Sequence, residues 1–144
     1  MPNWCENRLT IKGPAADTNS FREKAVGYPP WQTKEVPDPL NFHSLVPVPA
    51  ELLANDYSEE AERWEREHWG CKWGAAECEL VDAWDGELIY GFQTAWSPPI
   101  EFLQAVSRHY PKLVFLLDYE EPGMAFKGIC KIHQGQAEDH CLSY

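Results

Sequence analysis

The chain has 144 residues, of which 44% are hydrophobic and 13% aromatic, so it can bury a core and is not a disordered segment. Its formal net charge of −11 repels phosphate backbones, which argues against direct binding to duplex nucleic acid. Residues 51–87 hold twelve acidic side chains against three basic ones, a net charge of −9. Such a region suits a protein partner with a basic surface, and it also suits a face that only keeps the protein in solution.

The beginning of the chain has neither the basic nor the apolar stretch of a secretory signal. No apolar run approaches the roughly 18–20 residues of a membrane span. The five cysteines are odd in number and scattered, which fits reduced thiols. We therefore expect a cytoplasmic protein that makes no membrane contact.

Strict alternation of side chains predicts a first strand over residues 4–12. Its inward face consists of Cys5, Asn7, Leu9 and Ile11. A helix is expected over residues 14–26, because proline suits its first turn and glycine its C-terminal stop. Phe21 and Ala25 should face the core from this helix.

Six of the twelve prolines lie in residues 27–50, which predicts an extended excursion held to the body by Phe42, Leu45 and Val46. Ser58 is then predicted to cap a helix that runs to about Trp69, with glutamates in the first turn where the helix dipole favours them. The apolar stripe of this helix is expected to be Ala61, Trp64 and His68.

Residues 78–84 and 87–96 are predicted to form a hairpin, because Asp85-Gly86 between them is a strong type I′ turn signal. One face of the second strand should carry Leu88, Tyr90, Phe92, Thr94 and Trp96. Ser97 is then expected to cap a helix that begins with two prolines. Its core stripe would be Ile100, Leu103, Val106 and Tyr110.

The near-continuous apolar run over residues 112–120 predicts a central strand, and another strand is expected over residues 124–134. The tail, residues 135–144, would add a short edge strand or fray. The order of elements predicts an α+β fold of ferredoxin-like type (βαββαβ), with helices on one face of an antiparallel sheet. We expect one domain over residues 1–144, with an insertion at 27–76 after the first helix and an extra C-terminal strand.

Four motifs resemble the YubB-like family of small ferredoxin-fold proteins from phages, prophages and conjugative plasmids. They are residues 1–11 (MPNWCENRLTI), 42–49 (FHSLVPVP), 69–73 (WGCKW) and 94–99 (TAWSPP). The resemblance implies the fold and a mobile-element origin, and it implies no established activity. Genes of this kind often lie among accessory genes, including some that blunt host defences. Cys71 and Gly74 depart from the family pattern, in which a small polar residue and an acid are expected.

Metal and catalytic chemistry find little support in the pattern. The His68–Cys71 pair mirrors Cys130–His133, yet an i,i+3 pair within a strand points to opposite faces, so we expect no metal and no cofactor. Cys5 could meet a histidine only through the fold, and no local signature recommends it as a nucleophile. We therefore expect no catalytic residue.

A binding surface is the remaining candidate site. Its residues would be Asn3, Trp4, Asn7, Trp69, Lys72, Trp73, Trp96 and Ser97. Tryptophan beside asparagine and lysine is typical of interface hot spots and of base-stacking platforms. The alternative is structural: the tryptophans would fix the insertion on the sheet, Asn7 would bond to the backbone, and Ser97 would only cap a helix.

The leading hypothesis is a non-enzymatic accessory protein that binds another macromolecule, namely an acidic inhibitor of a host defence complex. Its partner surface would be Glu59, Glu60, Glu62, Glu65, Glu77, Glu79 and Asp82. One alternative is binding of a small ligand or of single-stranded nucleic acid on Trp4, Trp73 or Trp96. Another is a hydrolase or metalloenzyme.

Overall fold

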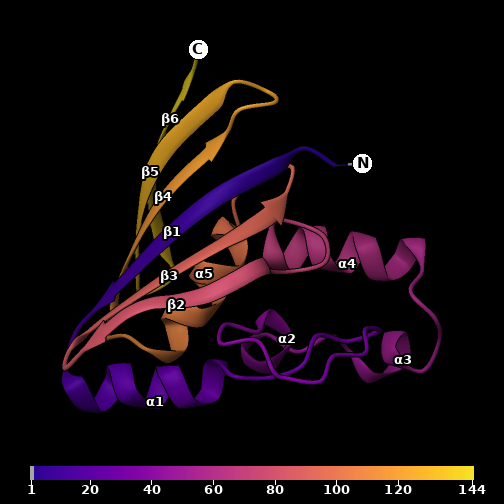
Figure 1. The fold of residues 1–144 in the computed structure, drawn as a ribbon, viewed down its shortest axis with the longest axis horizontal. Coiled ribbons are helices and arrows are strands. Elements are labelled where there is room, and N and C mark those ends of the chain that lie inside the picture. The colour runs from indigo at the N-terminus through magenta and orange to yellow at the C-terminus, as the bar shows by residue number, and fades with distance from the viewer. Residues whose placement is uncertain (1) are drawn as a thin grey trace.

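The computed structural model describes residues 2–144 as a six-stranded antiparallel sheet with helices (Figure 1). The strands are β1 (Trp4–Lys12), β2 (Ala76–Trp84), β3 (Glu87–Ala95), β4 (Val114–Glu121), β5 (Phe126–His133) and β6 (Gln136–Ser143). Their order in the sheet is β2-β3-β1-β4-β5-β6. The first four strands have the predicted ferredoxin-like arrangement, in which β1 lies between β3 and β4. The predicted extra strand is β5, and the tail forms β6 along its whole length.

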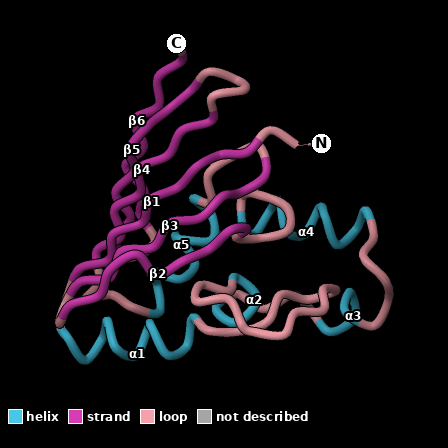
Figure 2. Tube along the Cα trace, in the orientation of Figure 1, coloured by secondary structure: helices cyan, strands magenta, loops and turns pink. Residues whose placement is uncertain are grey.

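Two helices, α1 (Ala15–Ala25) and α5 (Ile100–His109), are the helices of the ferredoxin-like unit. Three more lie between α1 and β2, where the insertion was predicted (Figure 2). They are α2 (Phe42–Leu45), α3 (Ala50–Leu53) and α4 (Glu59–Trp69). Among the described helices, none is long and apolar enough to cross a membrane.

The core forms where the inward face of β1 meets the helices. All four residues predicted to face inward on β1 are buried, as are Phe21 and Ala25 on α1. Phe21 packs edge-on against Tyr90 and Phe115 from the neighbouring strands, with ring centroids 6.2 and 5.7 Å away. The alternation of β1 was therefore a sound guide, because one face of this strand is covered by α1 and α5.

The insertion is fastened to the core by aromatic stacking. Phe42 on α2 stacks on Phe102 of α5, with ring centroids 3.8 Å apart, and meets Trp69 edge-on at 5.6 Å. The indole Nε1–H of Trp69 donates to the carbonyl of Val46 at 3.0 Å. The predicted anchor at Phe42 and Leu45 is confirmed, since both side chains are buried.

Helix α4 begins as predicted but is rotated relative to the expected stripe. Ser58 caps it by accepting a hydrogen bond from the backbone N–H of Ala61. Its buried residues are Ala61, Glu65 and Trp69 rather than Ala61, Trp64 and His68. The prediction was wrong because the insertion and the turn after α4 close over Glu65 and supply it with hydrogen-bond donors, so a charged residue takes a core position.

Three predictions for the second half of the chain were wrong in detail. The β2–β3 turn is not type I′, because Gly86 has a positive φ of 83° and Asp85 does not. Trp96 lies beyond the end of β3 and is exposed, so it does not continue the buried face of that strand. Ser97 does not cap α5, which begins at Ile100 without a side-chain cap; its hydroxyl donates instead to the carbonyl of Gly70.

Candidate functional site

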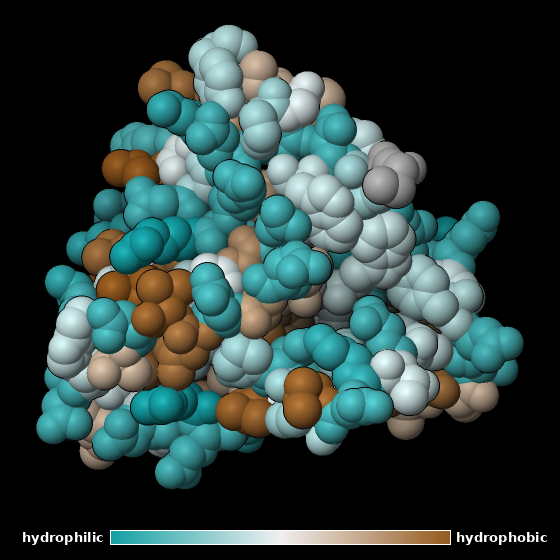
Figure 3. Space-filling view, in the orientation of Figure 1, coloured by the Kyte–Doolittle hydropathy of each residue, from teal (hydrophilic) through white to brown (hydrophobic). Residues whose placement is uncertain are grey.

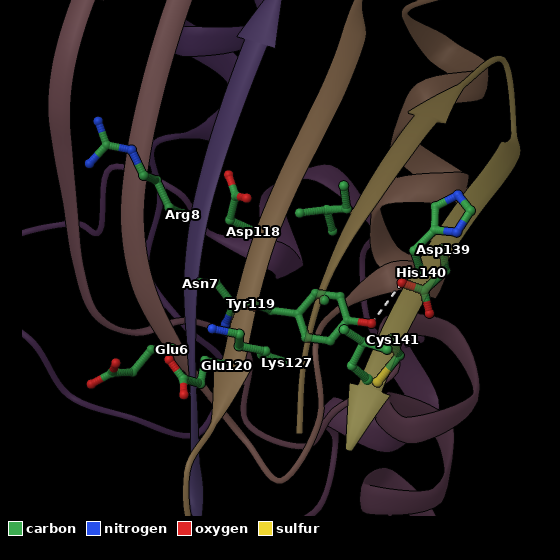
Figure 4. Close-up of a pocket in the computed structure, with 13 residues that line it drawn as sticks. Glu6, Asn7, Arg8, Asp118, Tyr119, Glu120, Lys127, Asp139, His140 and Cys141 are labelled. Atoms are coloured by element: carbon green, nitrogen blue, oxygen red, sulfur yellow. Dashed lines mark hydrogen bonds between the residues drawn. The ribbon is translucent and has the colours of Figure 1, made fainter. Parts of the chain in front are cut away.

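A groove with a volume of 880 Å³ lies across β1, β4, β5 and β6 (Figure 4). The strand register places residues of the four strands side by side, in two neighbouring rows that cross the groove. One row is Glu6, Glu120, Lys127 and Leu142, and the next is Arg8, Asp118, Ile129 and His140. Side chains of both charge signs occur there, and of the predicted site residues only Asn7 lines the groove. The groove therefore offers no focused chemistry of its own.

Three of the predicted tryptophans, Trp4, Trp73 and Trp96, lie at one end of the sheet. At this end β1 starts and β3 ends, close to α4 (Figure 1). The rings of Trp4 and Trp73 are 6.3 Å apart, and the ammonium of Lys72 lies 4.2 Å from the centroid of Trp73. The backbone N–H of Trp96 donates to the carbonyl of Asn3 at 2.9 Å. The structure thus brings together five residues that the sequence motifs had singled out.

Two of these tryptophans have an unusual backbone. Trp73 has a φ of 72° and Trp96 a φ of 70°, in the left-handed region that bulky residues rarely adopt. Their side chains are 38% and 42% exposed. Large aromatic side chains held in a costly conformation and left in contact with water are a feature of recognition sites rather than of cores.

Lys72, Trp96 and Ser97 also line a pocket of 410 Å³, together with Arg66 and the turn at Gly70. Lys72 and Arg66 are each paired with Glu62, at 3.4 and 3.1 Å. Both ion pairs use the same oxygen of Glu62, so one carboxylate offsets half of the positive charge of the two cations.

The other predicted site residues are structural. Asn7 is buried and its amide donates to the carbonyl of Cys5 and to the hydroxyl of Thr94, at 3.1 and 3.0 Å. The Thr94 hydroxyl donates to the carbonyl of Ser97, whose own hydroxyl donates to the carbonyl of Gly70, both at 2.6 Å. This chain of hydrogen bonds fixes the turn that carries Trp96. Trp69 is buried in the core, where it holds the insertion.

Five of the seven residues of the predicted acidic surface are exposed. Glu59 and Glu60 on α4 face water, as do Glu77, Glu79 and Asp82 on the edge strand β2. Glu62 is half-buried in its ion pairs.

Glu65 was wrongly placed on this acidic surface. It is 1% exposed, and its Oε1 accepts hydrogen bonds from the hydroxyl of Tyr57 and the backbone N–H of Trp73. Burial raises the pKa of this carboxyl. Tyr57 and its neighbour Trp31 were missed by the sequence reading, because they lie in irregular segments where no periodic pattern marks them.

Among the described residues, no hydrogen bond joins a thiol to an imidazole. Burial raises the pKa of Cys5 and Cys78 to about 12 and that of Cys130 to about 11, so these thiols stay protonated and weakly nucleophilic at neutral pH. The Nδ1 of His43 accepts a hydrogen bond from the backbone N–H of Val48, which assigns that ring to the insertion. Within residues 2–144, no cluster of three or more His, Cys, Asp or Glu side chains is placed to hold a metal ion.

The fold and this site define a small ferredoxin-like protein with an insertion and an exposed tryptophan end. Residues 68–143 match the family model described as the ferredoxin-like domain in Api92-like protein, so the chain belongs to the Api92-like family. Protein Api92 from Yersinia pseudotuberculosis has a similar crystal structure, with a TM-score of 0.67 at 10% sequence identity. The similarity covers 100% of this chain and 98% of that one, and at this identity it shows a shared fold alone. No curated protein matches the chain.

Proposed function

We propose that this is a non-enzymatic binding protein whose partner is a protein with a basic surface. The observation that carries the proposal is the pair Trp73 and Trp96, exposed and held in left-handed backbone conformations, next to the acidic helix α4. Buried tryptophans dominate the energy of many interfaces, while surrounding charges steer the encounter and select the partner. The tryptophans would therefore supply binding energy, and the acidic helix would steer the partner toward them.

The charge distribution favours a cationic partner. Residues 51–87 carry a net charge of −9, and the exposed acids of α4 and β2 belong to this segment. A surface of one sign attracts the opposite sign over about 8–10 Å at physiological ionic strength. Binding that relies on it should weaken as salt is added.

The resemblance to phage, prophage and plasmid proteins suggests where the protein acts and what kind of partner it binds. The protein would be an accessory product of a mobile element that acts in the host cytoplasm. Its partner would be a host defence complex, whose basic surface, one that normally holds nucleic acid, the acidic segment would occupy. The acidity of residues 51–87 supports this reading, because such a surface selects for negative charge.

The test is a charge reversal that leaves the fold intact. Glu59, Glu60 and Glu67 are exposed on α4, and changing all three to lysine should reduce capture of the partner from host lysate at least tenfold. The matched control reverses three exposed acids outside the segment, Glu23, Asp118 and Glu138, with the same change in net charge. Equal capture by the two triple variants would refute a specific role for the acidic helix.

The 410 Å³ pocket favours a second candidate function, the binding of a small anionic ligand or of single-stranded nucleic acid. Arg66 and Lys72 would contact phosphate there, and Trp96 would stack on a base. Titration with nucleotides and short oligonucleotides should then shift the indole signal of Trp96. An unchanged signal at millimolar ligand would remove this candidate.

A further inference from the structure

A small cavity of 190 Å³ lies within the insertion, between its proline-rich loop and the turn that follows α4. Its lining residues are Pro30, Trp31, Gln32, Tyr57, Glu65 and Trp73. At about 30 Å³ per water molecule it has room for about six waters, which is the size of a head group and smaller than a drug-sized ligand. Three aromatic rings and one carboxylate are an unusual lining for so small a space.

Two of the rings form a rigid corner. Trp31 and Tyr57 meet edge to face, with centroids 5.1 Å apart and an interplanar angle of 73°. The indole Nε1–H of Trp31 donates to the carbonyl of Asn55 at 2.8 Å, so this ring is fixed by a hydrogen bond as well as by packing. Trp73, which follows α4, lines the cavity with them.

A buried carboxylate completes the lining. Glu65 is 1% exposed, and the hydroxyl of Tyr57 and the backbone N–H of Trp73 donate to its Oε1 at 2.7 and 3.0 Å. These two donors orient the carboxylate but do not neutralise it. Of the ion pairs formed within residues 2–144, none includes Glu65. A buried carboxyl group without a cationic partner is costly to ionise, and an incoming cation would reduce that cost.

The backbone adds a second, independent sign of function. Trp31 has a φ of 62° and Trp73 a φ of 72°, so two of the three aromatic residues of the cavity adopt the left-handed conformation. Each costs free energy relative to an ordinary conformation, and such residues cluster at ligand sites. The fold thus keeps these rings in place against a local preference.

We propose that Trp31, Tyr57 and Trp73 form an aromatic cage over Glu65 that binds an alkylammonium group. The faces of aromatic rings attract cations, and quaternary ammonium groups are held in proteins by cages of this composition. Lys72 shows that Trp73 already attracts a cation, with Nζ 4.2 Å from the ring centroid, and its charge is offset by Glu62 at 3.4 Å. Where the ammonium belongs to a partner's side chain, the inference rests on the proposed binding function; where it belongs to a free molecule, it does not.

The experiment compares choline with 3,3-dimethylbutanol, its neutral carbon analogue of the same shape. Both are titrated into the full chain, and the indole N–H signals of the tryptophans are followed by NMR. The cage predicts that choline binds at least tenfold more tightly, which corresponds to 1.4 kcal/mol. Equal affinity for the two compounds, or no shift with choline, would overturn the proposal.

Variants separate the charge from the shape of the cage. Glu65→Gln keeps an oxygen that can accept both hydrogen bonds and removes the charge, so it should reduce the preference for choline to what the three aromatic rings supply. Trp31→Leu should weaken choline binding at least tenfold, whereas Trp84→Leu, at an exposed tryptophan of the β2–β3 hairpin, should leave it unchanged. If Trp31→Leu fails to fold, Glu65→Gln still decides: an unchanged preference for choline in that variant contradicts the cage.

The source of the ammonium is distinguished with peptides. A peptide carrying trimethyl-lysine that binds more tightly than choline supports a protein partner, and the reverse order supports a free small molecule. The triple reversal of Glu59, Glu60 and Glu67 should leave choline binding within twofold, because these side chains face water on α4. The proposed partner binding and the proposed choline binding can therefore be refuted separately.

Discussion

The hydrogen-bonded chain from Asn7 through Thr94 to Ser97 gives a sharp stability prediction. Thr94→Val has nearly the same shape but lacks the hydroxyl, and position 94 is fully buried. The change leaves one amide N–H of Asn7 and the carbonyl of Ser97 without their partners. Two lost partners cost about 3 kcal/mol, and the added methyl group returns about 0.8 kcal/mol, so the free energy of unfolding should fall by about 2 kcal/mol.

For a chain of this length that loss lowers the melting temperature by about 4–8 °C, which calorimetry or thermal circular dichroism would measure. The matched control is Thr10→Val, the same substitution on the outward side of β1. The Thr10 hydroxyl makes no hydrogen bond to another side chain within residues 2–144, so the change should stay within about 0.5 kcal/mol. A Thr94→Val protein that melts at or above the temperature of the wild type would show that the network does not stabilise the turn carrying Trp96.

Three further predictions concern single positions. Glu65→Gln should raise the melting temperature at about pH 7 and lose this advantage below about pH 4. Burial raises the pKa of the carboxyl in the folded state above its unfolded value, so the free energy of unfolding of the wild type falls as the pH rises from about 4 toward 7. A lower melting temperature of the variant at pH 7 would contradict this prediction. Trp69→Phe should lower the free energy of unfolding by about 1–3 kcal/mol in urea, since the bond to Val46 is lost; an unchanged midpoint would refute this. Gly128→Ala should speed amide exchange in β6, because its Cβ would lie 2.6 Å from the carbonyl of His140; unchanged protection would count against it.

Part of the candidate site could be predicted from sequence motifs. Motif residues Trp4, Lys72, Trp73 and Trp96 were singled out from sequence, and they do lie together at one end of the sheet. Asn7 and Ser97 belong to the same motifs but serve as internal hydrogen-bond donors. A motif records that a position matters, and it does not say whether the side chain faces the core or a partner.

The alternation of β1 and the turn and cap signals along the chain were enough to derive the ferredoxin-like order of elements, because periodicity and capping act between residues close in sequence. Only the tertiary structure decided which side of α4 is buried, since that choice depends on the donors that Tyr57 and Trp73 bring to Glu65. The same holds for the aromatic cavity, whose rings come from irregular segments on either side of α4 and whose carboxyl group comes from α4 itself. No local rule positions such residues, because their conformations are imposed by what the rest of the chain packs against them.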